Sequence, residues 1–110
     1  MSEILSYMEL VVNVYRLTLK LPQDERRALM SQMRGAAVSV PSNIAEGYGR
    51  QAKGEYRHHL SISRGSLLEL ETQLLVCAKV GYLENLQTQQ VLGEIQSISK
   101  MLGSLINKLR

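Results

Sequence analysis

The chain lacks tryptophan and phenylalanine, and it has a single cysteine among its 110 residues. Without these two aromatic residues, the core must be filled by Leu, Val, Ile, Ala and Met, as it is in helical bundles. The lone Cys77 excludes an intramolecular disulfide and favours a reducing compartment. A chain of this length has room for one hydrophobic core, so we expect a single domain over residues 1–110.

Long hydrophobic runs are also absent. The longest apolar segment, residues 10–21, is interrupted by Asn13, Arg16 and Lys20 and is shorter than the roughly 20 residues of a membrane-spanning helix. Met1 is followed by Ser-Glu-Ile rather than by a basic stretch and an apolar core, so no secretory signal is expected. We therefore expect a cytoplasmic protein with no membrane partner.

Apolar residues recur with the period of an α-helix along the chain, and no stretch predicts a strand. We expect four helices, at about residues 3–20, 22–48 (kinked near Pro41), 53–80 and 84–109. The connections between them are short, which makes successive helices antiparallel neighbours. The predicted fold class is therefore all-α, an antiparallel, up-and-down four-helix bundle.

The first helix has more apolar surface than one core face uses. Its apolar side chains cover about 240° of the helical wheel, whereas a bundle helix needs a stripe of just over about 100°. Because the segment is too short to enter a membrane, a second copy of the chain is the favoured cover, and we predict an oligomer. The third helix also has apolar residues off its main stripe, whereas those of the fourth occupy one face. The predicted interface residues are Leu5, Met8, Val12, Tyr15 and Leu19.

A proline and two glycines interrupt the helical pattern between residues 34 and 50. Pro41 cannot donate a helical hydrogen bond and predicts a kink or a break. Asn43 with Glu46 has the outline of a capping box, and Asn43 could also satisfy backbone groups freed by the proline. Gly47 and Gly49 predict a stop followed by a turn. The sequence thus predicts a kinked or broken helix that ends in a glycine-containing turn.

A family resemblance rests on two strings of sequence, AAVSVPSNIAEGYGR and GEYRHHLSISRGSLLELETQLLVCAKVGYL. Over roughly residues 4 to 83 the chain resembles the small four-helix-bundle proteins encoded in intervening sequences of 23S ribosomal RNA genes. Accessory proteins of diversity-generating retroelements look like relatives of the same group. The resemblance implies a ring-like homopentamer and an association with nucleic acid, with a reverse transcriptase or a ribosomal component as a candidate partner.

Basic residues gather in the middle of the chain. Residues 26–64 carry a net charge of +5, against −2 for residues 1–25 and zero for residues 65–110. Arginine offers forked donors to phosphates, and a tyrosine such as Tyr48 or Tyr56 offers a stacking plane to a base. We therefore predict a non-enzymatic, basic oligomeric scaffold that binds RNA or DNA phosphates. The candidate residues are Arg26, Arg27, Arg34, Arg50, Lys53, Arg57 and Arg64.

Two alternatives stay open. In the first, these charges are solvated faces and weak ion pairs, and the chain is a protein–protein interaction scaffold with no nucleic-acid role. In the second, the chain is an enzyme, which would need a metal ion or a carboxylate pair with strongly perturbed pKa values. The carboxylates of Glu46 and Glu69 have no nucleophile or phosphate loop beside them, so we expect one of them inside the bundle, paired with Arg34 or Arg64.

Metal binding is not expected either. His58 and His59 are adjacent, so on a helix their side chains point about 100° apart and cannot hold one ion together. Cys77 lies in the apolar string Leu-Leu-Val-Cys-Ala and is most simply a small core residue. We therefore assign no catalytic residue, no metal ligand and no cofactor.

Overall fold

Four α-helices make up the chain in a computed structural model that describes residues 2–110, with side chains described from residue 5 onward. No strand occurs within residues 2–110, so an all-α fold with four helices is confirmed. No helix begins or ends more than two residues from its expected position. The helices are α1 (Ser2–Thr18), α2 (Gln23–Gly49), α3 (Lys53–Lys79) and α4 (Asn85–Lys108).

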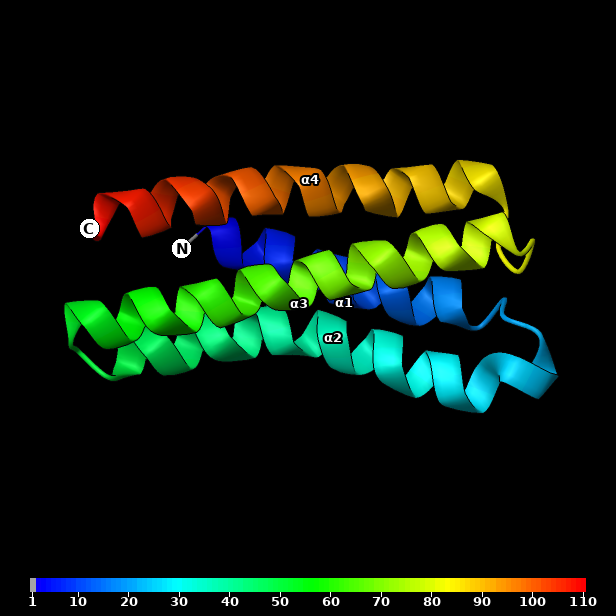
Figure 1. Cartoon of the computed structure of the whole chain (residues 1–110), viewed down its shortest axis with the longest axis horizontal. Helices are drawn as coiled ribbons and strands as arrows, with labels where there is room; N and C mark the ends of the chain where they lie inside the picture. Colours follow the sequence, from blue (N-terminus) through cyan, green and yellow to red (C-terminus); the bar gives the residue numbers. More distant parts are fainter. Residues whose placement is uncertain (1) are drawn as a thin grey trace.

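Successive helices run antiparallel along a particle of 44 × 23 × 20 Å (Figure 1). Each helix packs against its two neighbours in the cycle α1, α2, α3, α4. In the described residues, no Cα atoms approach within 8 Å between α1 and α3, or between α2 and α4. Helices α1 and α3 therefore occupy opposite corners of the four-helix arrangement. We call the end that holds the turn between α2 and α3 the α2–α3 end; the beginning of α1 and the end of α4 also lie there (Figure 1).

The core is aliphatic, as the absence of Trp and Phe requires. Cys77 is one of its buried residues, and burial raises the pKa of the thiol. Both observations agree with a structural role for this cysteine. The core residues with the largest fully buried side chains include Leu10, Met33, Leu60, Leu67, Leu70, Leu74, Ile95 and Leu102.

Helix α2 is not broken at Pro41: it continues from Gln23 to Gly49. The predicted capping box is wrong, because Asn43 and Glu46 both lie inside a continuous helix. The Asn43 amide donates instead to the Ser39 carbonyl (2.9 Å), and the Glu46 carboxylate forms an ion pair with Arg50, one turn later. A proline removes one hydrogen bond from the helix, and a long helix with a buried face tolerates that loss. A bend of the helix axis at Pro41 stays a prediction.

Of the two glycines expected to stop the helix, Gly49 is the last residue of α2, whereas Gly47 lies inside the helix. Gly47 is buried against α3, and a Cβ atom at this position would lie 2.6 Å from the Cβ of His59. Only glycine therefore allows the two helices to approach this closely. The chain reverses direction after the helix, at Gln51, whose φ of 63° is in the left-handed region.

A row of polar contacts joins α2 to α3. The His59 ring nitrogen Nδ1 lies 3.1 Å from the Asn43 oxygen Oδ1. Because the Asn43 amide nitrogen already donates to Ser39, this oxygen accepts and His59 donates. The Ser63 hydroxyl donates to the Val40 carbonyl (2.8 Å). Asn43 thus fixes the packing of two helices, and it does not satisfy the backbone carbonyl that Pro41 leaves free.

Candidate functional site

The seven candidate nucleic-acid-binding residues do not form one patch on a single chain. Helix α2 has 27 residues and is therefore about 40 Å long. Arg26 and Arg27 lie at its beginning, whereas Arg50 follows its end, so the two groups occupy opposite ends of the molecule. Arg34 lies between them, and Arg64 lies on α3, about three turns after that helix begins.

Arg34 is half-buried and connects α2 to the last turn of α1. Its Nε donates to the Thr18 hydroxyl (3.0 Å) and its Nη2 to the Tyr15 carbonyl (3.1 Å). Its guanidinium also lies over the Tyr15 ring, 4.2 Å from the centroid, as in a cation–π contact. These contacts satisfy a carbonyl at a helix C-terminus, where the backbone has no partner within the helix. Arg34 is therefore a structural residue.

Arg26 and Arg57 also bind backbone carbonyls. Arg26 donates to the carbonyls of Leu19 (3.1 Å) and Leu21 (3.3 Å), which closes the connection between α1 and α2. Arg57 donates to the Leu109 carbonyl (3.1 Å), which fixes the end of α4 beside the beginning of α3. A cation at a helix C-terminus is stabilising, because it satisfies free carbonyls and complements the helix dipole. Both side chains are half-buried and already have partners within the chain.

The expected buried ion pair is wrong. Glu46 and Glu69 are both exposed: Glu46 pairs with Arg50 (3.2 Å), and Glu69 accepts a long hydrogen bond from Gln73 (3.4 Å). The physical reason is that a carboxylate loses its hydration on burial, whereas surface pairing one turn apart avoids that cost. Arg34 reaches a neutral hydroxyl and a carbonyl instead.

The remaining basic candidates are free to meet a ligand. Arg27, Lys53 and Arg64 are exposed, and none of them has a hydrogen-bond or ion-pair partner among the residues the structure describes. Arg50 is exposed too, and its pairing with Glu46 is of the weak surface kind.

Sequence reasoning missed two basic residues that join the α2–α3 end. Lys108 is the last residue of α4, and Arg110 follows two residues later. The hydrogen bond from Arg57 to the Leu109 carbonyl holds this segment next to the beginning of α3. The antiparallel topology could have predicted this, because it places residues 105–110 beside residues 50–57. We call Arg50, Lys53, Lys108 and Arg110 the basic end.

An exposed aromatic side chain accompanies the basic end. The Tyr48 side chain is 73% exposed and meets the Tyr56 ring edge-to-face, with 5.8 Å between the centroids. Burial, and then the neighbouring Tyr48, raise the pKa of Tyr56, which therefore stays a hydrogen-bond donor at neutral pH. Cations beside an exposed aromatic ring are the elements that single-stranded nucleic acids bind.

The predicted interface residues of α1 form a continuous exposed stripe. The exposed fractions of their side chains run from 40% for Tyr15 to 62% for Leu5, and their spacing alternates between three and four residues. Helix α3 exposes a second set of apolar side chains, Ile62, Leu68, Leu75, Val76 and Val80. Because α1 and α3 occupy opposite corners, the two faces point away from each other.

Within residues 5–110, no group of three or more His, Cys, Asp or Glu side chains is placed to hold a metal ion. None of the helices in that range combines the length and the hydropathy needed to cross a membrane.

Comparison with known proteins agrees with this architecture. The crystal structure of a protein of unknown function from the S23 ribosomal protein family of Bacteroides thetaiotaomicron VPI-5482 superposes with a TM-score of 0.87. The two chains are 21% identical, and the match covers 94% of each, so the likeness shows the fold. No curated protein matches the chain in sequence. A sequence model described as 23S rRNA-intervening sequence protein matches residues 5–104, and the chain therefore belongs to this family.

Proposed function

We propose that the chain is a non-enzymatic, basic oligomeric scaffold that binds RNA or DNA phosphates in the cytoplasm. The observation that carries this proposal is the basic end, where four exposed cations lie beside the exposed ring of Tyr48. Arginine and lysine supply the phosphate contacts, and the tyrosine supplies a stacking surface for a base. The family description, which refers to 23S rRNA, supports RNA as the partner.

The proposed assembly is a closed ring of five copies, the number that the resemblance to the family implies. Each chain exposes two different apolar faces, on α1 and on α3, which point in opposite directions. A face that binds a different face on the next copy makes a head-to-tail contact, and such contacts close into rings. A ring would repeat the basic end five times, so each chain needs to contribute only a few phosphate contacts.

Fluorescence anisotropy with labelled RNA and DNA, single-stranded and double-stranded, tests the proposal across a salt series. The logarithm of the binding constant should fall steeply with the logarithm of salt concentration, by about 0.7–0.9 for each phosphate contact. The double variant Lys53→Glu/Arg110→Glu should weaken binding by at least about tenfold and reduce the slope. Lys79→Glu, at the far end of α3, is the matched control and should leave the affinity within about twofold.

Absence of binding at low salt would overturn the proposal. An unchanged affinity in the double variant would overturn the role of the basic end. In the first case the protein–protein scaffold becomes the better account, since the exposed apolar faces of α1 and α3 would remain unexplained by nucleic acid. The basic residues would then no longer support an assembly with rRNA or with a reverse transcriptase.

A further inference from the structure

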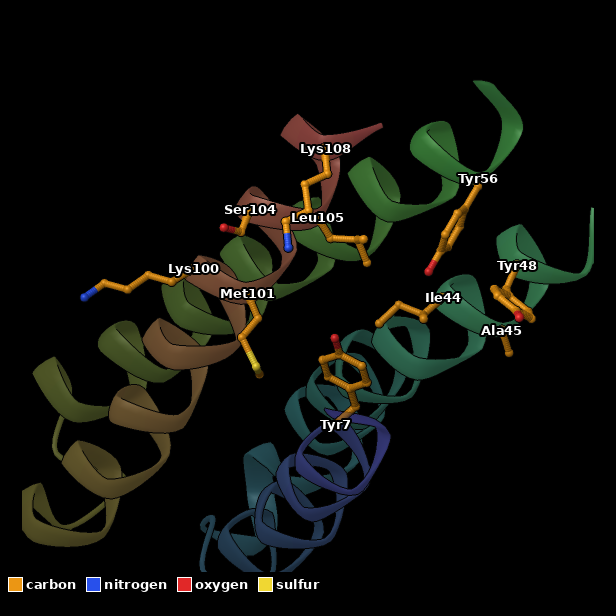
Figure 2. Close-up of a pocket in the computed structure, with 10 residues that line it drawn as sticks. All are labelled: Tyr7, Ile44, Ala45, Tyr48, Tyr56, Lys100, Met101, Ser104, Leu105 and Lys108. Carbon is orange, nitrogen blue, oxygen red and sulfur yellow. The ribbon is translucent and has the colours of Figure 1, made fainter. Parts of the chain in front are cut away.

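The bundle opens between α2 and α4 into a cavity of about 870 Å³, at the α2–α3 end (Figure 2). This volume lies in the range of about 300–1,000 Å³ that small-molecule sites occupy. Its apolar wall consists of Ile44 and Ala45 from α2 with Met101 and Leu105 from α4. The lining extends along α4 from residue 100 to residue 108, a distance of about 12 Å. The cavity is therefore long enough for an alkyl chain.

The polar groups that line the cavity are mainly hydrogen-bond donors and cations. Three of the five tyrosines of the chain contribute to it, and no Asp or Glu from residues 5–110 is found in its lining. Figure 2 shows the Tyr56 hydroxyl and the Lys108 ammonium pointing into the space between α2 and α4, whereas the Lys100 ammonium points away. The Ser104 hydroxyl also lies on the lining. An apolar wall with a single inward cation complements one negative charge on an apolar body.

We propose that this cavity binds a small amphipathic carboxylate. Lys108 and Tyr56 donate charge-assisted hydrogen bonds to the carboxylate oxygens. The alkyl chain lies over Ile44, Met101 and Leu105, whose half-buried or buried side chains lose water when the site fills. A neutral ligand would lack the charge-assisted hydrogen bond to Lys108. A highly charged ligand would leave the apolar wall uncovered. This inference does not depend on the nucleic-acid proposal.

Isothermal titration with decanoate, decanol and butyrate separates the two parts of the ligand. Below its micelle concentration, decanoate should bind with one molecule per chain, about tenfold more tightly than decanol, because the alcohol lacks the charge-assisted bond. Butyrate has the carboxylate but little apolar surface, and should not bind measurably. Equal binding of decanoate and decanol, or no binding of decanoate, would overturn the proposal.

Two variants test the location. Lys108→Met should lower the affinity for decanoate by about tenfold and leave that for decanol unchanged, whereas Lys79→Met, at the far end of α3, should change neither. Ala45→Trp should weaken binding of both, because Ala45 is an exposed lining residue and an indole there occupies part of the cavity. Circular dichroism checks that each variant folds. Wild-type affinity in Ala45→Trp would overturn the proposal.

The same variants distinguish other occupants of the cavity. If a second copy of the chain filled it, Ala45→Trp would change the oligomeric mass without ligand. If a nucleobase filled it, Ala45→Trp would weaken oligonucleotide binding. Either result would overturn the carboxylate proposal. We expect unchanged mass and wild-type nucleic-acid affinity in Ala45→Trp, so the two proposals fail separately.

Discussion

Helices α1 and α4 pack against the same core, but their outer faces differ. The outer face of α1 exposes five large apolar side chains from Leu5 to Leu19. The outer face of α4 is made of Gln, Ser, Asn and Lys residues, and Leu86, at its beginning, is its exposed large hydrophobic residue. The fold requires one apolar stripe from each helix, and α4 supplies no more than that. The additional stripe on α1 therefore indicates a contact outside the chain.

The largest expected effect is on the oligomeric mass, when a charge is placed on the outer face of α1; the same change on α4 is the control. Val12→Glu should dissociate the oligomer, because an unpaired carboxylate buried in an interface costs about 3–5 kcal/mol. The single chain should stay helical, since the Val12 side chain is 46% exposed within it. Ser97→Glu, on the outer face of α4, should leave the mass unchanged. Analytical ultracentrifugation with circular dichroism measures both, and an unchanged mass and thermal stability for Val12→Glu would refute the interface.

Two glycines contrast a buried helix contact with an exposed helix face: Gly47 lies between α2 and α3, and Gly93 lies on the outer face of α4. Gly47→Ala should lower the free energy of unfolding by about 1–3 kcal/mol, because its Cβ would meet His59 at 2.6 Å. Gly93→Ala, on the open outer face of α4, should raise it by about 0.5–1 kcal/mol through better helix propensity. Urea denaturation gives both values. Two changes of the same sign would show that α2 and α3 are less closely packed than the structure indicates.

Two arginines of α2 also differ in their surroundings: Arg34 has hydrogen-bond partners on α1, whereas Arg27 is exposed. Arg34→Met should lower the free energy of unfolding by about 1–2 kcal/mol, because it removes the donor to the Thr18 hydroxyl and one of the two donors to the Tyr15 carbonyl, which keeps its hydrogen bond from Thr18. Arg27→Met should change it by less than about 0.5 kcal/mol, since Arg27 is exposed and has no such partner in the described residues. Thermal unfolding followed by circular dichroism tests this difference. Equal effects would contradict the structural role of Arg34.

The smallest effect concerns the polar contact between α1 and α4. The Asn13 amide lies 2.9 Å from both carboxylate oxygens of Glu94. Burial raises the pKa of Glu94; the hydrogen bond from Asn13 lowers it in part, and Glu9 raises it further. A carboxyl with a raised folded-state pKa stabilises the fold at low pH, and this contribution is lost as pH rises through that pKa.

Glu94→Gln should therefore raise the free energy of unfolding at pH 7 by at most about 0.5 kcal/mol. The advantage over the wild type should disappear as pH falls below the ordinary pKa of a glutamate, where Glu94 is already neutral. Unfolding measured in urea between pH 4 and pH 7 would reveal this dependence. A benefit that grows toward low pH would mean that the pKa of Glu94 is lowered instead.

Much of the fold could be predicted because helical periodicity is a local property of the sequence. The four helices were expected within two residues of their bounds, and Gly81 ends α3 with a φ of 83°, as its position after the last apolar residues predicts. The exposed stripe of α1 was also predictable, since counting apolar residues on a helical wheel shows the excess over one core face.

The errors concern contacts between helices, which spacing along one helix does not determine. Gly47 fits a turn by its residue type, and only the position of α3 shows that it is a close-packing residue. Opposite charges make Arg34 or Arg64 a plausible partner for a buried glutamate, but the end of α1 offers Arg34 a carbonyl within reach. Lys108 belongs to the basic end only because the antiparallel arrangement places the end of α4 beside the beginning of α3. Each of these needs the relative placement of two helices before its role can be derived.

Native mass spectrometry of the wild-type chain tests the central claim, that the outer faces of α1 and α3 are covered by neighbouring copies. The account predicts a species of five times the 12.4 kDa chain mass at micromolar concentration. A single chain of 12.4 kDa under the same conditions would contradict it, because the exposed apolar face of α1 would then have no partner copy to cover it.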